Sequence, residues 1–569
     1  MLLLRPQGPA VKEKHVHEQD QGSEASIQPD NPARRRIFQA AAAVGAAASL
    51  PGVASAAPTA AVKPAAKGSL DAKLRASVKN VVLIYLENRS FNNLFADFPG
   101  LAVPLASVPA AAVQQRDRDG AILPTLPKAW GGVVPGRQNI GGKDYITTEA
   151  QSANLPNAPY KLHDADGKPL PEGIITRDLV HQFYHNQMQI NGGRNDYFAA
   201  WSDAGGMVMG YYGETSKNLG LYQIAREFTL CDNFFMAAFG GSYLNHQFLI
   251  SGRVPEYFNA AETPARSKIA VLDDGPQGVR LTLAPDSPKS ALDGKPKFVR
   301  NGAMTPDGYA VNTMAPPYQP SWVRPSFDGD PLHADPADPS TLPPQTYDTI
   351  GDLLSRRGVS WAWYGGGMQA ALDGRGAGEK PNFQYHHQPF NYFKQFAPGT
   401  EARAEHLRDG GLGDSPIGNK FIADIVAGTL PAVAFYKPQG NLNLHAGYSD
   451  IESGDAHIAN IIEHLKKSPQ WKEMVVVITF DENGGWWDHV APPKGDRWGP
   501  GSRIPAIVVS PHAKRGAVDH NFYDTTSVMR FITRLHGLPL LEGLAARNAA
   551  FEARGARPPG DLTATLRFR

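Results

Sequence analysis

Two pairs of oxygen-bearing side chains each stand directly after a run of apolar residues. Glu87-Asn88 follows the run at 81–86, and Asp481-Glu482 follows the run at 474–480. Such runs, mostly β-branched and without alternation, are typical of strands buried on both faces. Because sites in parallel sheets form at the carboxyl ends of strands, the two pairs could converge on one divalent cation. The alternative, in which Asp481 caps a turn and Glu87 is solvated, explains one such pair more easily than two.

A candidate nucleophile, Ser242, follows two glycines in Gly240-Gly241-Ser242. Apolar residues recur after it at helical spacing, at 244, 248 and 249. Ser242 is therefore predicted at a helix N-terminus, where backbone N–H groups and the helix dipole favour a phosphate. A serine hydroxyl needs a metal or a base to act as a nucleophile at neutral pH. A helix cap without catalysis remains an equally open interpretation of this segment taken alone.

Several histidines stand in segments rich in polar residues. They are His181, His185, His386, His387, His445 and His489. An imidazole can donate a hydrogen bond to a phosphoryl oxygen, and its cation can protonate a departing alkoxide. A single histidine is more often structural, so these residues become candidates only together with the predicted metal site.

The elements that must position these side chains follow an α/β pattern. A third apolar run spans residues 504–510, and helical spacing of apolar residues appears at 347–357, 455–467 and 525–536. Buried strands that alternate with helices predict a central, mostly parallel sheet flanked by helices. The chain has 57 glycines and 48 prolines, which indicates long loops. Residues 260–345 are rich in Pro, Asp and Gly and are predicted to be a loop-rich insertion with short strands of its own.

Composition restricts the classes of protein that need to be considered. Of the 569 residues, 42% are hydrophobic, enough for a large core, which excludes a wholly disordered chain. The net charge of +1 gives no reason to expect binding to nucleic acid. Cys231 is the single cysteine, so the sequence excludes an intrachain disulfide and cysteine-based zinc sites. No stretch approaches the roughly 18 apolar residues of a membrane span.

The N-terminal segment has the features of an export signal. Arg34-Arg35-Arg36 precedes a mildly apolar stretch at 40–50 and then the small residues Ala54-Ser55-Ala56, which resemble a cleavage site. The arginine pair favours the twin-arginine export machinery, which predicts a periplasmic or secreted protein. The expected organisation is an extension and signal at 1–56, a linker at 57–79, a catalytic domain at 80–545 and a tail at 546–569.

An ordered set of motifs resembles the bacterial phosphoesterase family, which groups respiratory-burst-inhibiting acid phosphatases with non-haemolytic phospholipases C. The resemblance extends from about residue 80 to about residue 540. The motifs are Glu87-Asn88-Arg89-Ser90-Phe91, His181 with Asn191-Gly192-Gly193, His386-His387-Gln388-Pro389-Phe390, and Asp481-Glu482-Asn483-Gly484-Gly485 with Asp488-His489-Val490. The resemblance implies the alkaline-phosphatase-like fold, a central sheet flanked by helices.

The resemblance also implies roles for individual residues. A divalent metal would be held by Glu87, Asn88, Asp481 and Glu482, with Ser242 as nucleophile and fifth ligand. The phosphoryl group would be bound or protonated by His181, His387 and His445. The substrate would also contact Asn88 and His386. Oxygen donors are compatible with Mg, Ca, Mn or Fe. One position departs from the family pattern, because Asn92 replaces the usual aspartate, and we expect Asn92 to lie outside the ligands.

The sequence thus predicts an exported, metal-dependent acid phosphatase that forms a phosphoserine. The context of Ser242 favours a phosphomonoesterase, since the phospholipase C members typically carry threonine there. The alternative within the family is a phospholipase C acting on phosphatidylcholine-type diesters, which calls for an apolar, choline-sized pocket. A sulfatase is disfavoured because no C/S-x-P-x-R pattern occurs. A metal-binding protein without catalysis would not need Ser242 and the histidines together.

Overall fold

The computed structural model describes residues 68–568 except 276–277, 377 and 379. The expected signal at 1–56 and the first part of the expected linker lie outside these residues. Residues 70–77 of the expected linker form helix α1 (Leu70–Ser77), which Ser69 caps by accepting from the Ala72 N–H. All of the described residues belong to one compact unit.

An eight-stranded sheet forms the centre of this unit, in the order β11-β10-β12-β1-β13-β14-β6-β15. Its strands are β1 (Asn80–Leu86), β6 (Thr229–Cys231), β10 (Trp361–Gly366), β11 (Leu407–Gly411), β12 (Val433–Lys437), β13 (Met474–Phe480), β14 (Ala506–Val509) and β15 (Ala517–Asp519). Among these strands only the pairs made by β14 are antiparallel. The predicted central, mostly parallel sheet is therefore confirmed, and the three apolar runs form β1, β13 and β14.

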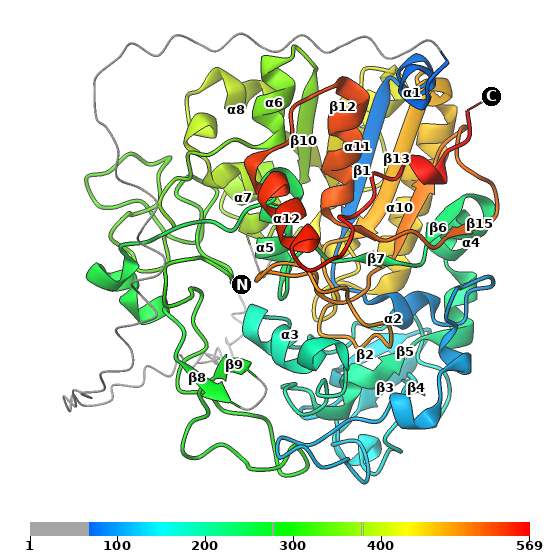
Figure 1. The fold of residues 1–569 in the computed structure, drawn as a ribbon, viewed down its shortest axis with the longest axis vertical. Coiled ribbons are helices and arrows are strands. Elements are labelled where there is room, and N and C mark those ends of the chain that lie inside the picture. The colour runs from blue at the N-terminus through cyan, green and yellow to red at the C-terminus, as the bar shows by residue number, and fades with distance from the viewer. Residues whose placement is uncertain (1–67, 276–277, 377, 379, 569) are drawn as a thin grey trace, which may run out of the picture. The chain divides into compact units, whose positions relative to one another are not determined.

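Strand β1 lies between two strands from the C-terminal half of the chain, and Figure 1 shows it in blue beside β13. Every residue of β1 and β13 is buried, as the apolar runs predict. Both neighbours run parallel to β1, so the carboxyl ends of β12, β1 and β13 lie at one edge of the sheet. The residues that follow these three strands are thereby brought together.

Helices cover the sheet, and they include the predicted ones. They are α2 (Phe91–Phe95), α3 (Phe183–Ile190), α4 (Gly220–Glu227), α5 (Ser242–Ser251), α6 (Ile350–Arg356), α7 (Met368–Leu372), α8 (Glu401–His406), α9 (Lys420–Ala427), α10 (Ile451–Lys467), α11 (Thr526–His536) and α12 (Glu542–Glu552). Helix α10 contacts α4 and α9, while α11 contacts α1 and α5. Helix α12 crosses the expected domain boundary at 545, and its Arg547 is buried and paired with Asp524.

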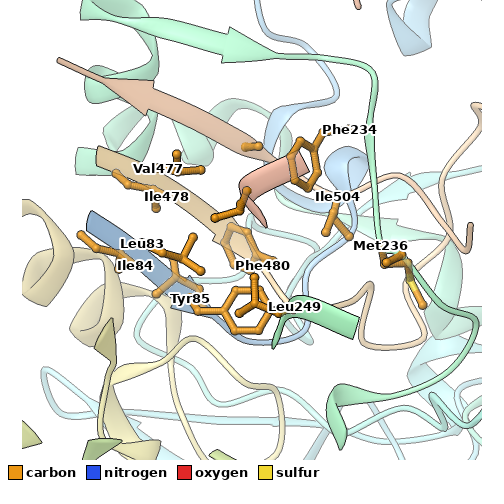
Figure 2. Close-up of a cluster of buried hydrophobic side chains, with 14 of the residues drawn as sticks. Leu83, Ile84, Tyr85, Phe234, Met236, Leu249, Val477, Ile478, Phe480 and Ile504 are labelled. Atoms are coloured by element: carbon orange, nitrogen blue, oxygen red, sulfur yellow. The ribbon is translucent and has the colours of Figure 1, made fainter. Parts of the chain in front are cut away.

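Apolar contacts fix α5 against the sheet. Figure 2 shows Leu249 of α5 beside Tyr85 of β1, with Ile84 and Phe480 in the same buried cluster. All ten residues of α5 are buried. Because Leu249 lies two helical turns after Ser242, this packing also fixes the position of the N-terminus of α5.

The insertion at 260–345 consists mainly of loops, as predicted. It contains the short strands β8 (Leu272–Gly275) and β9 (Gly278–Leu281). Further short strands lie outside both the sheet and the insertion: β2 (Val134–Ile140), β3 (Lys143–Thr147), β4 (Tyr160–Lys161), β5 (Gly210–Tyr211), β7 (Phe234–Phe235) and β16 (Tyr523–Asp524). Within residues 68–568, no helix combines the length and the apolar character that a membrane crossing requires.

Candidate active site

The two predicted pairs of metal ligands meet at the carboxyl edge of the sheet. Strands β1 and β13 are parallel and in register, so Glu87 and Asp481 leave the sheet side by side. The backbone N–H groups of Asn88 and Glu482 both donate to Oδ1 of Asp481, over 3.1 and 2.7 Å. All four side chains are fully buried. The structure thus brings together the four side chains that the sequence predicts to share a site.

Tight turns hold these side chains in place. Asn88 has φ 61°, a left-handed conformation that asparagine tolerates better than most residues. Gly484 also has a positive φ, and a Cβ there would lie 2.3 Å from the carbonyl oxygen of Asn88. Its backbone N–H donates to Oε2 of Glu482 over 2.6 Å. Glycine is therefore required at 484, because any side chain would push apart the two segments that carry the predicted ligands.

Ser242 faces the carboxylates from the first turn of α5. Its hydroxyl lies 3.0 Å from Oε2 of Glu87, 3.3 Å from Oδ1 of Asn88 and 3.5 Å from Oε1 of Glu482. The hydroxyl has one hydrogen and can donate to only one of these oxygens at a time. Gly241, not Ser242, occupies the N-cap position. The serine side chain is therefore directed into the acidic cluster instead of capping the helix.

The glycine before the cap lets α5 approach α3. Gly240 has φ +90°, and a Cβ there would lie 2.5 Å from the backbone nitrogen of Phe183. Gly241 is close to the backbone oxygen of His181, which a Cβ would approach to 2.9 Å. The two glycines thus place Ser242 next to His181, a relationship that the sequence alone does not reveal.

The acidic cluster concentrates negative charge in a buried volume. Burial, together with the charge of Glu87, raises the pKa of Asp481 well above its usual range. Burial and the neighbouring Glu87 likewise raise the pKa of Glu482. Burial alone would also raise the pKa of Glu87, but the charges of Lys437 and His387 hold it well below its usual value. Three adjacent buried carboxylates are the environment that a divalent cation stabilises.

The donor set fits a divalent cation in two further respects. Oδ2 of Asp481 is buried and has no hydrogen-bond partner among the described residues. Glu87, His246 and Asp481 offer ligand atoms that lie within 4.8 Å of one another. Carboxylate and amide oxygens are ligands that Mg²⁺, Ca²⁺ and Mn²⁺ prefer. The four predicted ligands therefore form a chemically suitable site for such an ion.

Two of the predicted histidines, His181 and His445, lie next to each other. The ring centroids of His181 and His445 are 5.6 Å apart. In each ring Nδ1 contacts a backbone carbonyl oxygen, that of Leu179 for His181 and that of Ala446 for His445. These contacts favour the proton on Nδ1 and leave Nε2 for another partner. Nε2 of His181 lies 3.6 Å from Oε1 of Glu482, which places it beside Ser242.

The doubled histidines occupy two different environments. His386 lines the cavity above Ser242. His387 is fully buried, with Nε2 2.7 Å from Oε1 of Glu87. Burial lowers the pKa of His387 to about 4, and it also lowers that of His386. His387 thus contacts a predicted metal ligand, while His386 is the member of the pair that reaches the cavity.

The remaining candidates lie away from the carboxylates. The ring of His185 packs against Phe298, with centroids 5.0 Å apart. His489 contacts Oδ1 of Asn92 through Nδ1, over 2.9 Å. The backbone N–H of Asn92 donates to Asp488 over 2.9 Å. Asn92 therefore belongs to a polar cluster outside the ligands, as expected.

Two buried residues of the site, Lys437 and His246, were not predicted from the sequence. Lys437 ends β12 and forms an ion pair with Glu87, with both side chains fully buried. His246 lies one helical turn after Ser242, with Nδ1 3.8 Å from Oδ2 of Asp481. Spacing of four residues on a predicted helix could have indicated His246, because it shares a face with Ser242. Lys437 follows a short apolar run, as Glu87 and Asp481 do, but a run of this length indicates a buried strand less clearly.

A cavity of about 740 Å³ leads to Ser242. His181, His386 and His445 contribute to its walls, together with Asp178 and Tyr448. More than half of its lining comes from the insertion at 260–345. The insertion is therefore part of the site, which its irregular sequence did not indicate.

Comparison with known proteins identifies the family. The sequence profile of the phosphoesterase family matches residues 78–539. Phospholipase C B of Mycobacterium tuberculosis is 23% identical over 527 residues, which cover 86% of this chain and 78% of that protein. The non-haemolytic phospholipase C of Burkholderia pseudomallei is 29% identical over 223 residues, 33% of this chain and 31% of that protein.

The chain is also similar to a solved structure, that of a protein in the alkaline phosphatase superfamily from Vibrio parahaemolyticus. The two are 14% identical, with a TM-score of 0.22, and the match covers 38% of this chain and 51% of the other. The matched residues include the motifs at both strand ends and the paired histidines. Because the match extends over most of its length, the chain belongs to the phosphoesterase family and is a phosphoric ester hydrolase.

Proposed function

We propose that this chain is a metal-dependent acid phosphatase that hydrolyses phosphomonoesters through a phosphoserine on Ser242. One observation carries the proposal. The hydroxyl of Ser242 lies within 3.5 Å of oxygens of Glu87, Asn88 and Glu482, and Ser242 also lines a cavity rich in polar side chains. A serine in this position can be activated and can also be reached by a small phosphate ester.

A divalent cation held by Glu87, Asn88, Asp481 and Glu482 would supply positive charge beside Ser242 and a phosphoryl oxygen. Lys437 forms an ion pair with Glu87, and Nδ1 of His246 lies 3.8 Å from Oδ2 of Asp481. The oxygen-rich donor set is compatible with Mg, Ca, Mn or Fe.

The reaction then proceeds in two displacements. Oγ of Ser242 attacks phosphorus, its proton passes toward the carboxylate oxygens that surround it, and the bond to the ester oxygen breaks. The departing oxygen takes a proton from Nε2 of the cationic form of His181 or His445, the two cavity-lining histidines whose Nδ1 already contacts a backbone carbonyl oxygen. Water then attacks the phosphoserine, releasing phosphate and restoring the hydroxyl of Ser242.

An acid optimum follows from the environment of His445. Burial lowers the pKa of its imidazole, so in the free protein the cation forms only at acid pH. A proton donor of this kind favours activity at low pH.

A second candidate is phospholipase C activity on the head group of a phosphatidylcholine-type lipid. The relatives support it, since both proteins named above are phospholipases C. The cavity favours the monoesterase instead. Its lining includes Lys268 and Arg300 and many polar side chains, whereas a choline pocket is expected to be apolar.

Export belongs to the same proposal. The arginine pair within Arg34-Arg35-Arg36, the apolar stretch at 40–50 and the small residues at 54–56 support the twin-arginine route to the periplasm or the medium. Detection of a product beginning near residue 57 outside the cytoplasm of an expressing bacterium would test this part.

The enzymatic proposal is tested by turnover of p-nitrophenyl phosphate and p-nitrophenylphosphorylcholine side by side, from about pH 4.5 to pH 8 so that a histidine titrates. A chelator-treated sample is measured in parallel. We expect the monoester to be preferred, with activity that is lost on chelation. Preference for the choline diester would replace the proposal with the second candidate, and turnover of neither substrate would contradict both.

A further inference from the structure

We infer that Lys268 and Arg300 form a subsite for a second anionic group of the substrate. The inference rests on the proposed phosphomonoesterase activity and narrows its substrate class. The preferred substrates would be phosphomonoesters whose leaving group carries a further carboxylate or phosphate. Both residues belong to the insertion, and both line the cavity that contains Ser242.

The insertion is fixed to the catalytic core beside His181. Oδ1 of Asn312 accepts from the backbone N–H of Phe183 over 2.9 Å, and its amide nitrogen donates to the carbonyl oxygen of Gly302 over 2.9 Å. Asn301 donates to the side chain of Gln182. These contacts tie the segment at 301–312 to the two residues that follow His181, so the wall has a defined position relative to the nucleophile.

Lys268 and Arg300 stand on two segments that pair with each other. The backbone N–H of Met304 donates to the carbonyl oxygen of Lys268 over 2.9 Å, and that of Val271 donates to Arg300 over 3.0 Å. Nε of Arg300 donates to the carbonyl oxygen of Ile269 over 2.6 Å. That bond holds the guanidinium against the neighbouring segment and leaves its terminal nitrogens as donors for an anion.

Neither cation is neutralised by a carboxylate within the described residues, since no ion pair involves Lys268 or Arg300 there. Asp178 is the one carboxylate among the described lining residues, and it lies with Oδ1 3.6 Å from Nδ1 of His181. The wall that the insertion contributes is therefore positive. It would attract a second anion and repel a quaternary ammonium such as that of choline.

Two matched substrate pairs test this inference on the full-length, metal-loaded protein. Glycerol 3-phosphate and 3-phosphoglycerate differ by a carboxylate, and fructose 6-phosphate and fructose 1,6-bisphosphate differ by a phosphate. Phosphocholine supplies a cationic leaving group. In at least one pair, we expect kcat/KM to be roughly tenfold higher for the substrate with the anionic leaving group than for the substrate with the uncharged leaving group. Phosphocholine should have the lowest kcat/KM. The pair that shows the larger ratio distinguishes a carboxylate from a phosphate subsite.

Variants then assign the effect to the two side chains. Lys268→Gln and Arg300→Gln are each expected to reduce the ratio roughly threefold, mainly through KM, and the double variant to bring it near one. Inhibition by inorganic phosphate should stay unchanged, since phosphate binds at Ser242. Arg266→Gln is the matched control, because Arg266 is exposed in the same turn as Lys268 but does not line the cavity. Lys268→Arg should retain the ratio.

The outcomes separate this inference from the proposed function. A ratio near one for both pairs, or a preference for phosphocholine, overturns the subsite while the monoesterase stands. If the ratio of kcat/KM within a substrate pair is unchanged in the double variant, the subsite is also overturned. If p-nitrophenyl phosphate is not hydrolysed but the choline diester is, the proposed function fails first and the subsite fails with it.

Discussion

Lys437 and Glu87 form an ion pair at the carboxyl edge of the sheet, and neither side chain is exposed to solvent. The ammonium also lies 5.0 Å from the ring centroid of Tyr85. Together with His387, Lys437 holds the pKa of Glu87 well below its usual range, although burial alone would raise it. Glu87 therefore remains charged beside Ser242, where it can bind a cation and accept a hydrogen bond.

Replacement of Lys437 by methionine should destabilise the metal-free protein strongly. Removing one partner of a buried pair leaves an uncompensated charge and typically costs about 3 kcal/mol of the free energy of unfolding. The loss should be smaller when a divalent cation is in excess, because the cation offsets the charge of Glu87. Thermal unfolding with chelator and with added cation measures both values. Lys297→Met, which removes an exposed ion pair with Asp286, should change the free energy of unfolding little. Equal losses of unfolding free energy in the two variants would contradict the prediction.

Ser242→Ala should lower kcat for phosphomonoesters by about a thousandfold or more, because the proposed nucleophile is lost. The metal content should persist, since four other side chains are predicted to hold the ion. Acid quenching with radiolabelled substrate should trap a phosphoprotein from the wild type and none from the variant. Ser267→Ala is the control, because Ser267 lines the same cavity but its hydroxyl donates to the backbone carbonyl of Pro264. Wild-type turnover by Ser242→Ala would exclude the phosphoserine mechanism.

The meeting of Glu87-Asn88 with Asp481-Glu482 could be predicted because two physical constraints act on the sequence near them. Strands buried on both faces must be apolar throughout, so β1 and β13 stand out as uninterrupted runs. Parallel strands end at the same edge, so the side chains that follow them meet. Lys437 could not be found in this way. Its role depends on β12 lying next to β1, and the order of strands in space does not follow their order in the sequence.

The cavity wall was unpredictable for a different reason. The apolar residues of the insertion do not recur at regular spacing. Its position depends on single side-chain contacts, such as the hydrogen bond that Asn312 accepts from the backbone N–H of Phe183. Its residues could be recognised as a loop-rich segment, but nothing in them indicated that Lys268 and Arg300 line the same cavity as Ser242. His387 shows the same limit, because adjacent histidines of identical type differ in whether they reach the cavity.

Asp481→Asn should preserve or raise the Tm of the metal-free protein and weaken its stabilisation by a divalent cation. In the absence of a cation, burial and the charge of Glu87 raise the pKa of Asp481, so this position favours an uncharged group, and an amide supplies one. The metal-free variant should therefore unfold at the same or a higher temperature than the wild type. The increase in Tm on adding Mg²⁺ or Mn²⁺ should shrink, because a charged ligand is lost. A lower Tm without metal and an undiminished increase with metal would contradict a cation site here.

His185 should make stability fall in acid. Burial, and next the charge of His181, lower its pKa to about 3, below the value of about 6.5 in an unfolded chain. The unfolded state therefore binds a proton more readily, and stability that is complete above about pH 6.5 declines as the pH falls toward 3. At pH 5 this linkage amounts to about 2 kcal/mol.

His185→Leu should accordingly flatten the decline in Tm between pH 7 and about pH 5, whatever its effect at pH 7. Phe298→Leu is the matched control, because it loosens the same ring contact and retains the imidazole. That control should lower Tm at both pH values and keep the wild-type slope. If His185→Leu instead kept the wild-type dependence of Tm on pH, the acid sensitivity would have to arise from other groups. The buried imidazole would then make no pH-dependent contribution to stability.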